Sequence, residues 1–321
     1  MIVATTPLRI PLGGGLTDLR AYAERYGGVT VSSTIGQATY VSVLPPVEQR
    51  FEVHYAGGFE TAGRVDEIRH DLVRESLRAV GMEMTPVRLA VWVDVAGESG
   101  LGTSGAITVG LLQALAAYRG DPLAPEAAAE VAARIEVEVL RGASGYHDPH
   151  VCARGGLLRL AYQGARVEAR RLALTPERRD AFARSLVLFA SGRQARTKPS
   201  LDLLSAQFEQ AVPVLHDIKA LALVLEGALE RGDLAEAARC IGQKQHLKMR
   251  LPGHFSDAFV EDVVARVEAC GAAAQVPGGK ISGYVLVCCP EAQHERVRRA
   301  LSDLREVPLE LSERGTRTVS L

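Results

Sequence analysis

No lysine precedes Lys198 in this chain of 321 residues. A phosphate group bound by the first part of the chain would therefore need arginine, a metal ion or backbone N–H groups to balance its charge. The formal net charge is −1, and lysine and arginine form no run along the sequence. This charge pattern argues against a nucleic-acid-binding protein.

Cysteines and long apolar segments are also scarce. The five cysteines have no regular spacing, which argues against a disulfide framework and favours the reducing cytoplasm. The pair Cys288-Cys289 ends an apolar run and is interpreted as two core thiols. No apolar stretch is long enough to cross a bilayer, and the N-terminus lacks the pattern of a secretory signal. We therefore expect a cytoplasmic protein with neither a membrane nor a nucleic-acid partner.

The remaining sequence predicts an α+β protein. Strand and helix patterns are mixed and several strand pairs resemble hairpins, which argues against a doubly wound parallel sheet. The composition changes near residue 175, where we place a boundary between two domains. Strands are predicted over 2–12, 29–44, 51–57, 87–95, 156–163, 166–174, 186–191, 278–289 and 306–311. Helices are predicted over 16–28, 65–81, 124–142 and 293–304, with another after the loop described next and two long ones in the second half.

A glycine-rich turn leads directly into an apolar helix within residues 94–115. Residues 97–104 read GESGLGTS and nearly fit the Walker pattern G-x-x-x-x-G-K-[ST], with Thr103 where the lysine should be. Glycines let backbone N–H groups approach phosphate oxygens, and a helix N-terminus adds partial positive charge, so both features remain without the lysine. The loop alone supports a tight turn with a serine N-cap about as well as it supports a phosphate site.

Three further clusters contain residues suited to catalysis or ligand binding. The first has Arg9 on a strand, a triple-glycine turn at 13–15, and Asp18 at a helix start. The second has Glu136 on a helix and Asp148 beyond a glycine-flanked loop, and the third is PGGKISGYVLV in the second half. Phosphoryl transfer needs positioning, charge neutralisation and a group that accepts the hydroxyl proton. A carboxylate beside an arginine stays ionised and can accept that proton.

Together these segments resemble the GHMP kinases, the superfamily of galactokinase and of homoserine, mevalonate and phosphomevalonate kinases. The glycine loop is similar to the family's second motif, P-x-x-x-G-L-G-S-S-A-A, with Ala96 in place of the proline. Residues 6–28 are similar to the start of D-glycero-D-manno-heptose 7-phosphate kinases and their fucokinase-like relatives, R-I-x-x-x-G-G-G-T-D. The resemblance implies a two-domain α+β fold. An N-terminal ATP-binding domain like ribosomal protein S5 domain 2 would span 1–175, and a ferredoxin-like C-terminal domain 176–321.

The resemblance also implies ATP as the phosphate donor, Mg²⁺ as the metal and a sugar or sugar phosphate as the acceptor. Asp148 would act as the catalytic aspartate with Arg9 as the cation beside it. Mg²⁺ would be held by Glu136 together with Thr103 or Ser104. The residues that would bind the ATP phosphates are Gly97, Gly100, Leu101, Gly102, Thr103, Ser104 and Gly105. Asp18 would bind the sugar hydroxyls.

Further acceptor contacts are expected from the glycine turn and from a basic loop. Gly14, Gly15 and Thr17 accompany Asp18 in the first cluster. A phosphate on the acceptor would be received by Arg193 or Arg196, or by the adjacent Lys198; a solvated basic loop is the alternative. Without the resemblance, Asp148 and Asp18 are also explained as helix caps, and Glu136 as a solvated helix residue.

Two departures from the family pattern affect the expected activity. The third motif runs from Gly283 straight to Tyr284 and lacks the usual polyglycine, which could weaken turnover. His147 and His150 surround Asp148 where this branch has K-Q-D-Q-Y. The alternatives are therefore a non-catalytic relative that binds nucleotide or sugar phosphate, and a GHMP kinase for a non-sugar alcohol. The chain is expected to be a monomer or a homodimer.

Overall fold

The computed structural model describes residues 1–95, 99–142, 144–193, 197–279 and 283–321. Two sheets organise this part of the chain, a nine-stranded one and an antiparallel four-stranded one, which confirms the α+β class. Within these residues no helix is long and apolar enough to cross a membrane.

The larger sheet is built around two long strands, β1 (Ile2–Gly13) and β2 (Gly28–Leu44). The first half of β2 pairs with β6 and its second half with β5, so one strand carries two branches of the sheet. The pairing of β1 with β2 shifts register between Pro7 and Arg9 and again between Pro11 and Gly13. Such irregularities bend a strand and re-aim its side chains, and here they lie on either side of Arg9. The other strands of this sheet are β3 (Phe51–Tyr55), β4 (Gly58–Ala62), β5 (Arg88–Val93), β6 (Leu157–Gln163), β7 (Arg166–Arg171), β12 (Leu311–Ser312) and β13 (Arg317–Ser320).

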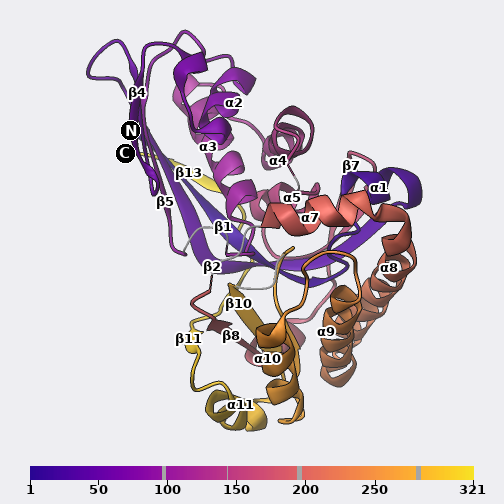
Figure 1. The fold of residues 1–321 in the computed structure, drawn as a ribbon. Helices are drawn as coiled ribbons and strands as arrows, with labels where there is room; N and C mark the ends of the chain where they lie inside the picture. The colour runs from indigo at the N-terminus through magenta and orange to yellow at the C-terminus, as the bar shows by residue number, and fades with distance from the viewer. Residues whose placement is uncertain (96–98, 143, 194–196, 280–282) are drawn as a thin grey trace.

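Helices cover one face of the larger sheet, where Figure 1 shows α2, α3 and α4 grouped together. The central helix α3 (Thr103–Arg119) is apolar and mostly buried, as expected for a helix packed between a sheet and other helices. Its neighbours are α2 (Asp71–Ala79), α4 (Pro125–Arg134) and α5 (His147–Arg154); α1 (Arg20–Tyr26) lies against β6. This packing fixes the N-terminus of α3, which follows the glycine loop.

The smaller sheet has the strand order β11-β8-β10-β9. Its strands are β8 (Leu186–Ala190), β9 (Ala273–Gln275), β10 (Tyr284–Cys288) and β11 (Arg305–Val307). The helices that accompany it are α6 (Pro176–Arg184), α7 (Thr197–Ala206), α8 (Phe208–Arg231), α9 (Leu234–Met249), α10 (Ala258–Glu268) and α11 (His294–Ala300). Alternate residues of β8 face opposite sides: Leu186 and Leu188 pack with α8 and α9, and Val187 and Phe189 with α10 and α11. The β-α-β-β-α-β arrangement is that of a ferredoxin-like domain, the fold that the resemblance implied for the second half.

Three predicted elements are wrong in their extent. The strand over 278–289 is shorter, because β10 begins at Tyr284 and Gly278 and Gly279 lie in a loop. The helix over 65–81 is a short 3₁₀ helix (Val65–Glu67) followed by α2. The chain is extended between them because the buried carboxylate of Glu60 accepts the backbone N–H groups of Arg69 and His70. The strand over 306–311 is split into β11 and β12, which belong to different sheets and are separated by Pro308, a residue that cannot donate to a ladder.

The end of the chain returns to the larger sheet. The strand β13 pairs with β1, and β12 pairs with β2. The two ends of the chain consequently lie side by side in Figure 1, and the Met1 amino group donates to the Leu321 carbonyl at 3.1 Å. The domain boundary at residue 175 stays a prediction, with these last strands forming part of the first sheet.

Candidate active site

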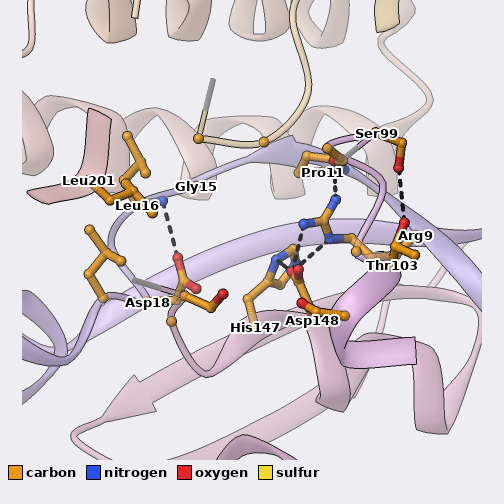
Figure 2. A pocket seen from close by; sticks show the side chains of 18 of the residues that line it. Arg9, Pro11, Gly15, Leu16, Asp18, Ser99, Thr103, His147, Asp148 and Leu201 are labelled. Atoms are coloured by element: carbon orange, nitrogen blue, oxygen red, sulfur yellow. Dashed lines mark hydrogen bonds and ion pairs between the residues drawn. The ribbon is translucent and has the colours of Figure 1, made fainter. Parts of the chain in front are cut away.

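A cavity of about 660 Å³ is lined by residues from both halves of the chain. The glycine turn, the loop before α3 and the start of α5 form one side, and α7, α8, α9 and the loop after β9 form the other. Figure 2 shows the side chains that converge on it. Its polar side chains come from Arg9, Asp18, Ser99, Thr103, Ser104, Ser144, His147, Asp148, Lys198, Lys244 and Lys248.

The centre of the cavity wall is the ion pair of Arg9 and Asp148. Arg9 Nε lies 2.8 Å and Nη2 2.7 Å from Asp148 Oδ1, and Arg9 Nη1 donates to the Gly100 carbonyl at 2.6 Å. Burial alone would raise the pKa of Asp148, but the charge of Arg9 and the hydrogen bond from His147 outweigh it and hold that pKa well below its usual range. The carboxylate therefore stays ionised at any physiological pH.

One oxygen of Asp148 is left for a ligand. Oδ1 faces three donors, two from Arg9 and one from His147 Nδ1 at 2.9 Å. Because an ionised carboxylate only accepts, Nδ1 of His147 carries a proton, and Nε2 faces the buried Ser32 hydroxyl at 2.6 Å. His147 thus fixes the rotation of the carboxylate, and among the described residues no hydrogen bond reaches Oδ2.

The glycine loop and the start of α3 lie against Arg9 and Asp148 because Gly102 and Gly105 lack side chains. Gly102, in a left-handed conformation, caps the N-terminus of α3, and a Cβ there would lie 2.9 Å from Arg9 Cγ. A Cβ at Gly105 would lie 2.7 Å from the Cβ of Asp148. Arg9 also donates its backbone N–H to the Leu101 carbonyl at 2.9 Å. The loop, the helix start and the ion pair therefore form one rigid unit.

Glu136 lies directly behind this loop. It occupies a single π-helical turn (Ile135–Val139) at the end of α4, a kind of distortion common at functional sites. Burial raises its pKa to about 7, against a hydrogen bond from Ser104. Its Oε1 atom is buried and has no hydrogen-bond partner among the described residues. Glu138, two positions on, is exposed, as its opposite placement on the helix predicted.

The acid on the glycine-turn side is Asp18. Its Oδ1 accepts the Leu16 backbone N–H at 3.1 Å, and burial raises its pKa while the nearby His147 lowers it. A Cβ at Gly145 would lie 2.1 Å from Asp18 Oδ2, so the carboxylate is held in a narrow space. Figure 2 shows Asp18 and Asp148 on the same side of the cavity, with His147 between them.

Several predicted site residues do not line the cavity. The Thr17 hydroxyl donates to the Gly14 carbonyl at 2.7 Å within the turn, and Gly14 itself packs on the Val29 backbone. Leu101 is a core residue, and Arg193 is paired with Asp257 at 3.2 Å beside the ring of Phe259. The other members of this group that lie off the cavity are Gly105, Glu136 and His150. Gly97 and Arg196 lie outside the described residues.

Sequence reasoning missed two lysines on α9. Lys244 and Lys248 are 5% and 2% exposed, and both line the cavity. Lys248 Nζ donates to the carbonyls of Val276 and Gly278 at 2.9 and 2.7 Å. The spacing of four residues on a helix places both side chains on one face, and that was the only signal the sequence offered.

The loop after β9 reaches the glycine loop even though the third motif lacks its polyglycine. A Cβ at Gly278 would lie 2.9 Å from the Cα of Gly100, so the two backbones are in direct contact. Gly278 and Gly279 both line the cavity. The second half of the chain therefore contacts Gly100, the residue whose carbonyl accepts a hydrogen bond from the Arg9 guanidinium.

The chain is similar in sequence and in fold to known kinases. The family model described as the GHMP kinases N terminal domain matches residues 69–156. The D-glycero-alpha-D-manno-heptose 7-phosphate kinase of Campylobacter jejuni is 24% identical over 296 residues, which are 87% of this chain and 85% of that protein. The crystal structure of a D-glycero-D-manno-heptose 1-phosphate kinase from Bacteriodes thetaiotaomicron has a TM-score of 0.83 at 23% identity, covering 100% of this chain and 99% of that one.

A second solved structure extends the fold comparison to an enzyme with a different acceptor. Streptococcus pneumoniae phosphomevalonate kinase, in complex with phosphomevalonate and AMPPNP, has a TM-score of 0.79 at 12% identity and covers 97% of this chain and 100% of that one. Residues 69–156 therefore match a GHMP kinase N-terminal domain, and the chain shares the fold of these solved kinases.

Proposed function

We propose that this chain is an ATP-dependent sugar kinase that transfers the γ-phosphate to a hydroxyl, the anomeric one, of a heptose phosphate or a related sugar. The observation that carries the proposal is the Arg9–Asp148 pair, which faces the cavity beside the glycine loop at the N-terminus of α3. A helix N-terminus and a glycine loop suit phosphate groups, and an ionised carboxylate nearby suits a hydroxyl acceptor. The two heptose phosphate kinases that the chain resembles support the choice of acceptor.

The catalytic roles follow from the free oxygen of Asp148. In the proposed reaction, Oδ2 accepts the hydrogen bond of the acceptor hydroxyl and takes its proton as the oxygen–phosphorus bond forms. Because the pKa of Asp148 is low, the carboxylate acts mainly by orienting the hydroxyl, and the proton moves late in the transfer. Arg9 keeps the carboxylate in place and adds positive charge beside the transferred group.

The two sides of the cavity suit two substrates. The donor side would include Ser99, Gly100, Gly102, Thr103 and Ser104, all of which line the cavity. The acceptor side would include Gly15 and Asp18, with a buried carboxylate that can accept hydrogen bonds from sugar hydroxyls. Gly14 and Thr17 would act indirectly, by shaping the turn.

The residues present fit a magnesium ion. The Oε1 atom of Glu136 is buried, has no hydrogen-bond partner among the described residues, and is the hard oxygen donor that Mg²⁺ prefers. Ser104 lies beside the Glu136 carboxyl group and lowers its pKa through a hydrogen bond. Among the described residues no group of three acidic, histidine or cysteine side chains could hold a metal ion by itself. A magnesium ion in a kinase needs no such group, because substrate phosphates supply some of its ligands. Mg²⁺, when bound, would neutralise charge on the phosphates. We assign Glu136 and Ser104 as its ligands, because Thr103 instead pairs with Ser99 at 3.0 Å.

Glutamine at position 136 should raise the Mg²⁺ concentration needed for half-maximal activity about tenfold or more, because an amide oxygen is a poorer magnesium ligand than a carboxylate. ADP formation titrated with Mg²⁺ at saturating substrates measures this. Glu138→Gln is the matched control, since Glu138 is exposed on the same helical turn. An unchanged Mg²⁺ requirement in Glu136→Gln would remove Glu136 from the metal site.

The proposed function itself is tested by ADP release over an acceptor panel. The panel contains heptose 7-phosphate, heptose 1-phosphate, the free heptose, common hexoses and mevalonate. We expect turnover with a heptose phosphate and little with mevalonate, because Asp18 presents a carboxylate to a polyhydroxylated acceptor. Turnover with mevalonate alone, or nucleotide binding without turnover on any acceptor, would contradict a sugar kinase.

A further inference from the structure

Lys244 is a buried cation whose chemistry the family motifs do not account for. It projects from α9 into the cavity and is 5% exposed. Its Nζ donates to Gln275 Oε1 at 2.8 Å, and Gln275 Nε2 in turn donates to the Pro11 carbonyl on β1. A Cβ built on Gly15 would lie 3.8 Å from Nζ, so the ammonium group lies next to the glycine turn. Gln275 thus fixes the lysine head between the two halves of the chain.

The charge of Lys244 has no counterion in the part of the chain that the structure describes. Its hydrogen bond to Gln275 goes to a neutral amide, and no carboxylate oxygen of the described residues lies within 4.0 Å of Nζ. Burial, and after it the charge of Arg9, lower the pKa of Lys244 to about 7, and the charge of Asp18 opposes both effects. A buried cation beside a second cation is costly, and an anionic ligand between them would offset the cost.

The neighbours of Lys244 indicate which anion it meets. One helical turn further along α9, Lys248 holds the Val276 and Gly278 carbonyls, and Gly278 touches Gly100 of the glycine loop. Lys248 therefore lies toward the donor side. Lys244 lies between that side and the glycine turn, close enough to Arg9 and Asp18 to interact with both charges. This position is where a phosphoryl group would pass from donor to acceptor.

We propose that Lys244 binds the phosphoryl group in transfer and, from the C-terminal half, faces Arg9 across it. This inference rests on the proposed kinase function. In the transfer, the bond between the γ-phosphorus and the acceptor oxygen forms while its bond to the oxygen shared with the β-phosphate breaks. The hydroxyl proton goes to Asp148 and the electron pair leaves with ADP. Lys244 takes on the role that donors of a polyglycine third motif would serve, because it supplies positive charge from the same side of the cavity.

Nucleotide binding tests the inference without turnover. AMPPNP carries a γ-phosphoryl group and ADP lacks it, so the ratio of their dissociation constants, measured by calorimetry with Mg²⁺, isolates contacts to that group. Lys244→Met should lower the preference for AMPPNP about tenfold or more while ADP affinity changes little, since a charge-assisted hydrogen bond is lost. Lys219→Met is the control, because Lys219 is half-buried and, like Lys244, hydrogen-bonded, in its case to the Tyr26 carbonyl, but does not line the cavity.

A second variant and a second ligand pair complete the test. Lys244→Gln can keep the hydrogen bond to Gln275 but lacks the positive charge. It should therefore lose the preference for AMPPNP over ADP to the same extent as Lys244→Met. Binding of a heptose phosphate relative to the free heptose should be unchanged in both variants. A loss confined to the phosphorylated sugar would overturn the inference and make Lys244 an acceptor-phosphate residue. An unchanged AMPPNP preference would reject it while leaving the kinase proposal standing, whereas a wild-type protein that binds neither nucleotide would reject both.

Discussion

Asp148→Asn should lower turnover by about 10³-fold or more, because it removes the proton acceptor while preserving the size of the side chain. The affinity for nucleotide should change little, since Asp148 faces the acceptor hydroxyl in the proposed reaction. Single-turnover ADP formation with saturating sugar and calorimetry with AMPPNP measure the two quantities separately. Weakened nucleotide binding with normal turnover at saturation would contradict the assigned role.

The control for this variant is Asp262→Asn on α10. Asp262 pairs with Arg266 on the surface at 2.9 Å and its side chain is 60% exposed, so the substitution repeats the chemistry away from the cavity. Exposed ion pairs contribute little to stability, and we expect wild-type activity and an unchanged unfolding midpoint. A comparable activity loss in the control would show that the effect of Asp148→Asn is not specific to the site.

Arg9→Met should lower turnover by about 10²–10³-fold, through the loss of a preorganised positive charge beside the transferred group. A second effect acts through Asp148. The charge of Arg9 is the largest effect that counters burial at that carboxyl, ahead of His147, so removing Arg9 raises the pKa of Asp148. The acceptor site would then be partly protonated at a pH where the wild-type carboxylate is ionised.

The pH profile of turnover separates the two effects. Asp148 must be ionised to accept a proton, so activity depending on it is lost as pH falls through its pKa. In the wild-type protein that pKa lies far below the ordinary range, and no acid limb from Asp148 is expected above the pH at which the protein unfolds. In Arg9→Met the acid limb should move to higher pH. A uniform loss at every pH would show that Arg9 supplies charge but does not control the ionisation of Asp148.

The central part of the site could be predicted because its residues sit in ordered local patterns. Arg9 precedes a glycine turn on a strand, Glu136 lies on a helix, and Asp148 follows a short loop, so each was found within one motif. The choice between Thr103 and Ser104 could not be made from the sequence. The choice depends on which of the two hydroxyls points toward Glu136. Thr103 and Ser104 are adjacent in the first turn of α3, so the rotation of that helix about its axis decides it.

The lysines of α9 could not be predicted, for a different reason. In the sequence QKQHLKMR they have the appearance of a solvated helix face, and lysine is almost never fully buried unless paired. Their burial comes from Gln275 and the loop after β9, which are about 30 residues away in the chain and packed only in the folded state. The same non-local pairing explains β12 and β13: strands of two and four residues have too short a pattern to reveal that they join the first sheet.

The five buried cysteines allow local unfolding of this chain to be measured by thiol labelling. All are free thiols, and burial raises the pKa of Cys152, Cys288 and Cys289, so a folded chain offers no ready thiolate to an alkylating reagent. Cys152 lies on the helix that carries Asp148, whereas Cys240, Cys270, Cys288 and Cys289 lie around the smaller sheet. Alkylation followed by mass spectrometric mapping of the labelled cysteines would therefore distinguish local unfolding of α5 from unfolding of the second half of the chain, with no introduced probe.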